Sequence, residues 1–231
     1  MLLLGIDTSA AVSACVHDGT SVLAEAFEHD PRRHAELLAP MITDVLARAG
    51  VDRVDLTDVV VGSGPGPFTG LRVGLVTART LGLALDVGVH GVCSLDALAA
   101  EALASGVPGL DGGFLVATDA RRREVYWACY DAAGRRVNGP HVGPAAEVER
   151  AGLPTVGRGA QLYSEALPGP DGHEADQGPL DPRASFVATL AAAALAAGET
   201  ETSGGVLMEP EPLYLRRPDA VEPGRRKPVL S

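Results

Sequence analysis

Aromatic residues are scarce in this chain. They make up 4% of the 231 residues, although hydrophobic residues as a whole make up 46%. A core of this composition must be packed from alanine, valine and leucine rather than from large rings. The length is enough to bury a substantial core without disulfides or structural metal ions, in one large domain or two small ones. We favour two compact lobes.

Cysteines and long apolar runs are also few. The three cysteines, Cys15, Cys93 and Cys129, are far apart and lie among apolar residues, which indicates reduced thiols in the cytosol rather than a disulfide framework or a zinc cluster. The opening apolar run has no basic flank and leads into Asp7, unlike an export signal. No run reaches the roughly 18 to 20 apolar residues of a membrane span. We therefore expect a cytoplasmic protein with no membrane role.

Basic residues are fewer than acidic ones: the chain has 19 lysines and arginines and 30 acidic residues, which gives a formal net charge of -11. Such a chain repels the phosphates of nucleic acid unless a local basic surface overcomes the repulsion. This chain is therefore a poor candidate for binding RNA alone. Basic residues cluster at Arg121, Arg122 and Arg123 and again over 216–227, and solvated surface is the simpler interpretation of both clusters.

The first half alternates between strand and helix patterns. Period-two and buried apolar runs predict strands, and apolar positions at helical spacing predict helices. The predicted order is βββαβαβα, with strands at 2–8, 12–17, 21–27, 59–61 and 87–92 and helices at 34–49, 71–85 and 94–104. This order predicts a mixed sheet flanked by helices. A Gly-Val-Pro stretch at 106–108 marks the expected domain boundary, so the first lobe is predicted at 1–106.

The second half is less regular and predicts a smaller lobe at 107–215. Strands are expected at 113–118, 124–130 and 155–157, helices at 145–151, 160–167 and 183–197, and a loop at 168–181, which is rich in proline, glycine and acid. Beyond 198 the pattern is that of a linker, and the basic tail at 216–231 is expected to fray.

Two segments are candidates for phosphate binding. Asp7, Thr8 and Ser9 end the first strand, where a carboxylate and two hydroxyls could face a nucleotide; simple turn chemistry, with side chains bonded to local amides, is the alternative. Residues 62–72 join a buried strand to a helix through a loop with Gly64, Gly66 and Thr69, where amides could approach an anion. This loop lacks the Gly-Lys-Ser/Thr of a Walker A motif, and its two prolines cannot donate hydrogen bonds. A rigid structural or interface loop is therefore the rival interpretation.

Metal-ligand and nucleophile motifs are missing from the sequence. The six histidines form no His-x3-His pair and no HExxH motif, and no Gly-x-Ser-x-Gly elbow is present. We expect no metal site and no catalytic residue in this chain.

Several motifs occur in the same order as in a known family. They are Leu4-Gly5-Ile6-Asp7-Thr8-Ser9, His34-Ala35-Glu36-Leu37-Leu38-Ala39-Pro40, Gly64-Pro65-Gly66-Pro67-Phe68-Thr69-Gly70-Leu71-Arg72-Val73-Gly74, Gly91-Val92-Cys93-Ser94-Leu95, Asp119-Ala120-Arg121, Glu124-Val125-Tyr126 and Pro212-Leu213-Tyr214-Leu215-Arg216. On these motifs the sequence resembles the TsaB (YeaZ) family of tRNA threonylcarbamoyladenosine biosynthesis proteins. Ala35 and Pro67 stand where serine is common. The resemblance implies an α/β fold of two ribonuclease-H-like lobes of the actin-like ATPase (ASKHA) type, the second lobe reduced.

The resemblance also implies a role. Members of this family pair with a paralogue, TsaD, which holds a metal and transfers a threonylcarbamoyl group to tRNA, and an ATPase subunit, TsaE, joins the pair. The expected function is a non-catalytic scaffold subunit with no tightly bound cofactor. ATP or ADP would be bound only within the complex, and tRNA would be contacted only through it. A small-molecule kinase of the same fold would need a competent phosphate site between full-sized lobes. A metallopeptidase would need ligands that the sequence lacks.

The helix after the glycine-rich loop carries a ridge of small residues. Gly70, Gly74, Ala78 and Gly82 recur every fourth residue, so another helix could approach its backbone closely. The alternative is that the ridge lets the helix sit tightly on its own sheet. The resemblance favours a two-helix patch that forms a homodimer in isolation and a similar heterodimer with TsaD. The residues predicted for this interface are His34, Leu38, Met41, Gly70, Arg72, Gly74, Ala78 and Gly82.

Overall fold

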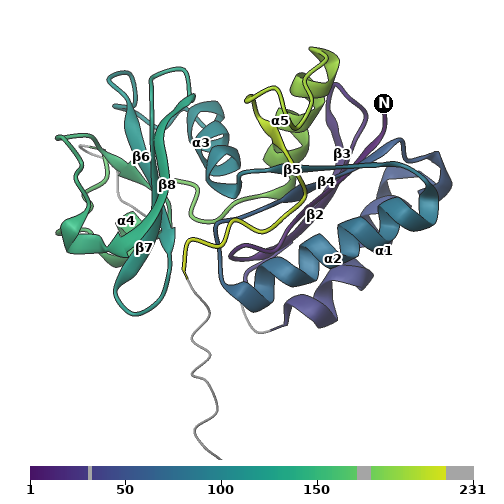
Figure 1. Ribbon diagram of the computed structural model, residues 1–231, viewed down its shortest axis with the longest axis horizontal. Coiled ribbons are helices and arrows are strands. Elements are labelled where there is room, and N and C mark those ends of the chain that lie inside the picture. Colours follow the sequence, from purple (N-terminus) through teal and green to yellow (C-terminus); the bar gives the residue numbers. More distant parts are fainter. Residues whose placement is uncertain (31–32, 171–177, 217–231) are drawn as a thin grey trace, which may run out of the picture.

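The computed structural model describes residues 1–30, 33–170 and 178–216, and these form two lobes, each built on its own β-sheet (Figure 1). The first lobe has a six-stranded sheet in the order β10-β5-β4-β1-β2-β3, and the second has a four-stranded sheet in the order β8-β7-β6-β9. The remainder of the predicted tail, 217–231, lies outside the described residues. None of the helices in the described ranges is both long enough and apolar enough to cross a membrane.

The first lobe follows the predicted order βββαβαβα. Its elements are β1 (Leu3–Asp7), β2 (Val12–His17), β3 (Val22–Glu28), α1 (His34–Ala49), the 3-10 turn η1 (Arg53–Asp55), β4 (Asp58–Gly62), α2 (Phe68–Leu85), β5 (Gly88–Val92) and α3 (Ser94–Ala104). Strands β1, β2 and β3 pair antiparallel, whereas β1, β4 and β5 pair parallel. The connection between the parallel strands β4 and β5 contains α2, and the connection between β1 and β4 contains β2, β3 and α1; parallel neighbours require long connections of this kind.

Both faces of this sheet are apolar and covered by helices. On β4, Val59 and Val61 point to the core under α1 and α2, whereas Val60 points to the core under α5 (Ala184–Ala196). A valine run with no polar alternation is what a strand buried on both faces requires. Figure 1 shows α1 and α2 side by side on one face, with α5 on the other.

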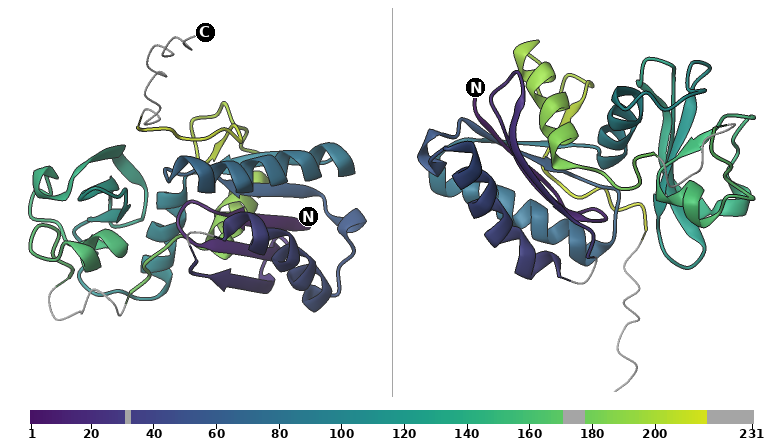
Figure 2. Two further views of the ribbon diagram at one scale, coloured as in Figure 1. Left: turned by 90° about the horizontal axis from the view of Figure 1, so that it is seen from below. Right: turned by 180° about the vertical axis from the view of Figure 1, so that it is seen from behind.

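The second lobe is smaller, and its core lies between the sheet and α3. It contains β6 (Phe114–Asp119), β7 (Glu124–Tyr130), β8 (Arg136–Pro144), the 3-10 turn η2 (Ala145–Glu147), β9 (Thr155–Val156) and α4 (Arg158–Leu162). Leu95 and Leu98 of α3 pack with Phe114 and Tyr130, whose rings stack with centroids 5.5 Å apart. Helix α3 therefore also contributes to the core of the second lobe, and Figure 2 shows it lying beside the second-lobe sheet.

Three elements of the second lobe differ from prediction. The predicted helix at 145–151 is only the short turn η2, and the helix expected at 160–167 is α4, which ends at Leu162. Strand β8 was not predicted, because its sequence contains Gly139, Pro140, Gly143 and Pro144. Proline is tolerated there because β8 is an edge strand, where a missing donor costs no ladder hydrogen bond.

The lobe boundary also differs from the simple cut at 106/107. The chain returns to the first lobe with α5, which packs against β1, β2 and β4, and with β10 (Leu207–Met208), which pairs antiparallel with β5. The segment 107–215 is therefore not one lobe. The physical reason is that the first sheet has two apolar faces, and α1 and α2 cover only one of them.

Candidate functional site

The Asp7-Thr8-Ser9 turn lies buried at the end of β1, and its carboxylate is hydrogen-bonded by the chain itself. Asp7 Oδ1 accepts from the backbone N–H of Ser9 at 2.8 Å and from its hydroxyl at 2.7 Å. Asp7 Oδ2 accepts from the hydroxyl of Ser94, the first residue of α3, at 2.6 Å. Burial raises the pKa of Asp7, and the hydrogen bonds from Ser94 and Ser9 oppose that rise. Both oxygens are thus engaged inside the fold.

Thr8 attaches the same turn to the start of α2. Its hydroxyl donates to the carbonyl of Gly70 at 2.8 Å and accepts from the N–H of Gly74 at 3.0 Å. The hydroxyl therefore uses its donor and an acceptor position within the chain. This is the turn chemistry that the sequence left open as an alternative to phosphate binding.

The glycine-rich loop closes over the turn. A Cβ on Gly66 would lie 2.5 Å from the carbonyl oxygen of Ser9, so only glycine fits at this approach. Gly64 is tied down by its N–H, which donates to the hydroxyl of Ser94 at 3.1 Å. Among the predicted phosphate-binding residues Thr69 is exposed, and it lines the space outside the loop. The backbone of the loop therefore contacts the turn directly.

The ridge of small residues on α2 faces inward, which corrects its predicted placement at an interface. A Cβ on Gly74 would lie 2.5 Å from Thr8 Oγ1, one on Gly70 would lie 2.7 Å from the carbonyl oxygen of Thr8, and one on Gly82 would overlap Val89. Ala78 is completely buried in the core. The ridge lets α2 lie close to its own sheet.

The other predicted interface residues divide by exposure. Leu38 is buried in the core under α1, and Met41 packs partly against it. His34 is half-buried beside Gly70, whereas Arg72 is exposed. The side of α2 that faces solvent carries two apolar side chains that prediction missed, Val76 at 61% exposure and Leu83 at 87%. Val76 follows Arg72 by four residues and Leu83 follows Arg79 by four. This spacing places them on the same side of the helix and could have been found in the sequence.

A cleft of about 250 Å³ lies between the lobes, outside the closed loop. On the second-lobe side Arg158 of α4 pairs with Asp181, and Asp181 also lies 2.9 Å from His29 Nδ1 of the first lobe. The Asp181 side chain is 1% exposed. Further lining residues are Ser9, His34, Thr69, Gly70, Asp119 and Arg121. Sequence reasoning missed Asp181 and Arg158, because one lies in a stretch that predicts only a loop and the other in an unremarkable helix.

His34 reaches this cleft from the start of α1. Burial lowers its pKa, and a hydrogen bond with the backbone of Ala10 opposes that effect. Its Nε2 atom is buried without a hydrogen-bond partner in the described part of the chain. Within the described ranges, no group of three or more His, Cys, Asp or Glu side chains has the arrangement of a metal site.

Comparisons with known proteins match this chain to a family model, to curated relatives and to solved structures. The family model of TsaD, the tRNA N6-adenosine threonylcarbamoyltransferase, matches residues 22–222. TsaB of Escherichia coli (strain K12), a tRNA threonylcarbamoyladenosine biosynthesis protein, is 37% identical over 134 residues, which cover 56% of this chain and 55% of that protein. An uncharacterized protein of Mycobacterium tuberculosis (strain ATCC 25618 / H37Rv) is 42% identical over 223 residues, covering 94% of this chain and 93% of that protein.

A solved structure extends the similarity to the whole fold. YeaZ from Pseudomonas aeruginosa superposes with a TM-score of 0.75 and 32% sequence identity, covering 93% of this chain and 99% of that one. The two lobes are those of the ribonuclease-H-like, actin-like ATPase (ASKHA) fold. The chain belongs to the TsaB (YeaZ) family.

Proposed function

We propose that this chain is a non-catalytic subunit of the machinery that makes N6-threonylcarbamoyladenosine in tRNA, pairing with the transferase TsaD. Its relatives carry the name of that biosynthesis, and the TsaD family model also matches the chain. The observation that supports the non-catalytic role is the Asp7-Thr8-Ser9 turn. The side-chain oxygens of Asp7 and Thr8 form hydrogen bonds within the chain, and the backbone of Gly66 packs against Ser9. Such a subunit works in the cytoplasm, where tRNA is modified.

The proposed contact with TsaD is the solvent face of α2, together with the neighbouring face of α1. Leu83 and Val76 expose apolar surface that burial against a partner would remove from water. Arg72 and Arg79 lie on the same face, between and beside these apolar positions. In the absence of TsaD the same face supports an isologous homodimer. ATPase subunit TsaE completes the proposed complex, and ATP or ADP is bound only there.

Co-purification with TsaD, followed by a tRNA-modification assay with and without this chain, tests the proposal. Leu83→Glu places a charge in the proposed contact at a side chain that is 87% exposed, and it should weaken association with TsaD at least tenfold without unfolding the chain. Val137→Glu is the matched control, because Val137 is 64% exposed but lies on β8 of the other lobe. Modification by this chain alone, or by TsaD and TsaE without it, would contradict the subunit role. Unchanged pairing by Leu83→Glu would place the contact elsewhere.

A further inference from the structure

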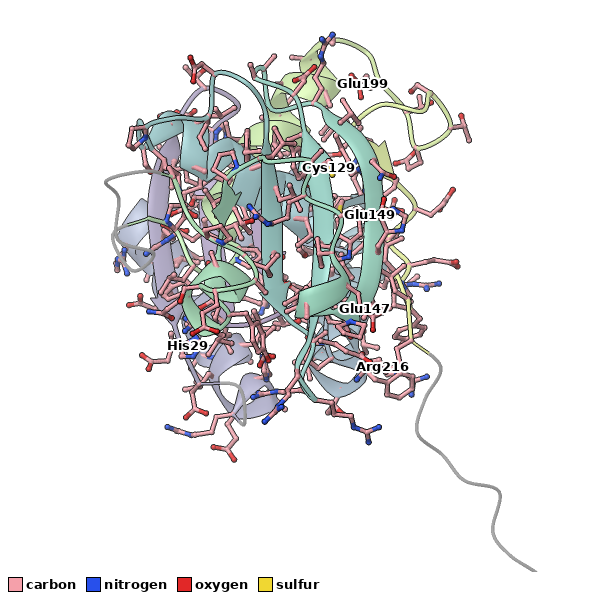
Figure 3. The ribbon with its side chains drawn as sticks, turned by 90° about the vertical axis from the view of Figure 1, so that its left-hand side faces the viewer. His29, Cys129, Glu147, Glu149, Glu199 and Arg216 are labelled. Carbon is pink, nitrogen blue, oxygen red and sulfur yellow. The ribbon has the colours of Figure 1, made fainter. Side chains whose placement is uncertain are left out.

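The first basic cluster of the sequence and Arg216, the first residue of the second, lie at one pocket between the lobes. The β6–β7 turn carries the first cluster, and Arg216 begins the second; its Nη1 donates to the carbonyl of Ala120 at 3.1 Å, and its guanidinium pairs with Glu124. Figure 3 shows Arg216 at the lower end of the second-lobe sheet. The adjoining pocket has a volume of about 270 Å³, and its lining includes Pro67, Phe68, Arg121, Arg122, Tyr126 and Tyr214.

Aromatic rings form the first-lobe wall of this pocket. Phe68 and Tyr214 stack with centroids 5.0 Å apart and an interplanar angle of 28°. The guanidinium of Arg72 lies 3.8 Å from the centroid of the Phe68 ring, and its Nε donates to the Tyr214 hydroxyl at 3.1 Å. Phe68 is 37% exposed and Tyr214 38%, so both rings also reach solvent. Arginine and accessible rings therefore stand together around one opening.

The backbone of the β6–β7 turn does not account for its arginines. Arg121, Arg122 and Arg123 have φ angles of 63°, 56° and 65°, in the left-handed region that glycine and asparagine adopt more readily. Asp119 holds the turn by accepting from the N–H of Arg121 at 2.8 Å. Local conformation would favour other residue types at these positions. The arginine side chains themselves therefore call for an explanation.

We propose that this pocket binds a single-stranded segment of RNA, with Arg121 and Arg216 contacting phosphates and Tyr214 or Phe68 stacking on a base. Asp119 and Glu124 pair with these two arginines and orient them, and each guanidinium has five N–H donors, so donors remain for a phosphate. Positive side chains beside aromatic platforms are the general chemistry of single-strand binding. The chain as a whole has a net charge of -11 and repels phosphates, so it can bind RNA only where a local basic surface overcomes this repulsion. The arginines around this pocket form such a surface.

The identity of the RNA as tRNA rests on the proposed function, whereas binding of a single strand can be measured separately. The probe is a fluorescein-labelled oligoribonucleotide without secondary structure, titrated with the purified chain at low ionic strength and followed by fluorescence anisotropy. Arg121→Gln removes one positive charge from a side chain that is 62% exposed. It should weaken binding on the order of three- to tenfold and reduce the slope of log affinity against log salt by about 0.7.

Arg135→Gln is the matched control. Arg135 pairs with Asp131 at 2.8 Å in the turn at the other end of β7 and is 82% exposed, so it carries the same charge change away from the pocket. It should leave affinity and salt slope within twofold of the unsubstituted chain, whereas Tyr214→Leu should weaken binding through loss of stacking. Absence of RNA binding, equal losses in Arg121→Gln and Arg135→Gln, or equal displacement by polyglutamate would overturn the inference.

The same variants separate this inference from the proposed function. If Arg121→Gln still co-purifies with TsaD but the pair binds tRNA more weakly, both proposals are supported. If the chain binds the oligoribonucleotide but does not pair with TsaD, the proposed function fails and the RNA site stands. Pairing and modification without any effect of Arg121→Gln on tRNA affinity would overturn the RNA site alone.

Discussion

At the scale of single residues, the buried carboxylates differ in how completely they are hydrogen-bonded. Asp7 has a donor for each oxygen, whereas Glu101 of α3 pairs through Oε1 with Arg183 at 3.2 Å and has a buried Oε2 without a partner in the described chain. Burial raises the pKa of Glu101 to about 7, although Arg183 opposes the rise. An incompletely satisfied buried acid holds its proton more tightly in the folded state than in the unfolded chain.

This difference predicts a pH dependence of stability that Glu101→Gln removes. The folded pKa of about 7 exceeds the ordinary value of 4.5. The stabilising contribution of the protonated acid is therefore fully present below about pH 4.5 and lost as pH rises to 7. Urea unfolding at several pH values should show the unsubstituted chain losing stability relative to Glu101→Gln across this window. The same change at Glu36, whose side chain is 69% exposed, is the control. A constant difference between the chain and Glu101→Gln over the whole window would contradict the account.

Residue types predicted the candidate site only in part. Asp7, Thr8 and Ser9 were identifiable because they follow a strand, but their partners Ser94 and Gly70 are 87 and 62 residues away from the residues they bond. The residues next to a carboxylate in the sequence do not show which distant hydroxyl will form a hydrogen bond with it. The choice between phosphate binding and turn chemistry therefore depends on tertiary contacts that the sequence does not show.

At the scale of elements, α2 shows how one helix can carry two different faces. Its small residues let it lie on β1 and β5, and its apolar Val76 and Leu83 face solvent. The four-residue spacing of these small residues predicts that another backbone approaches closely, but the spacing is the same whether that backbone belongs to the same chain or to another. The spacing of residues shows which of them share one face of a helix. It does not show what that face packs against, because the packing partner is far away in the sequence.

Gly74→Ala tests the inward ridge. Alanine favours a helix by about 1 kcal/mol over glycine, but its Cβ would lie 2.5 Å from Thr8 Oγ1, so a net loss of about 1 to 3 kcal/mol is expected. Thr8→Ala removes that oxygen, so Gly74→Ala should cost at least about 1 kcal/mol less in the Thr8→Ala background. The double-mutant cycle is measured by urea unfolding. Gly143→Ala, at an open position on β8, should stay within about 0.5 kcal/mol. Additive losses would mean that the two positions do not contact each other.

At the scale of the whole molecule, the lobes share elements instead of following each other along the chain. Helix α3 contributes to the cores of both lobes, and α5 and β10, which follow the second lobe in the chain, pack on the first sheet. Beyond β10, the N–H of Leu213 donates to the carbonyl of Ser63 at 2.9 Å, and Arg216 reaches Glu124 of the second lobe. The sequence predicted every strand and α-helix of the first half, but a boundary placed at a glycine and proline stretch could not reveal this return.

The returning segment predicts that residues 1–106 do not fold alone. Without α5 the face that holds Cys15, Val60 and Val92 is exposed to water, because Val187 and the alanines of α5 cover it. At roughly 0.8 kcal/mol for each buried methyl-sized group, the loss approaches the marginal stability of an ordinary domain. Circular dichroism should show no cooperative unfolding of this fragment. As the control, a chain that joins 1–106 to 183–216 through a flexible linker keeps α5 and should unfold cooperatively at a measurable urea concentration. If the short fragment also unfolds cooperatively, the first lobe folds without α5, and the boundary predicted between residues 106 and 107 is a true domain boundary.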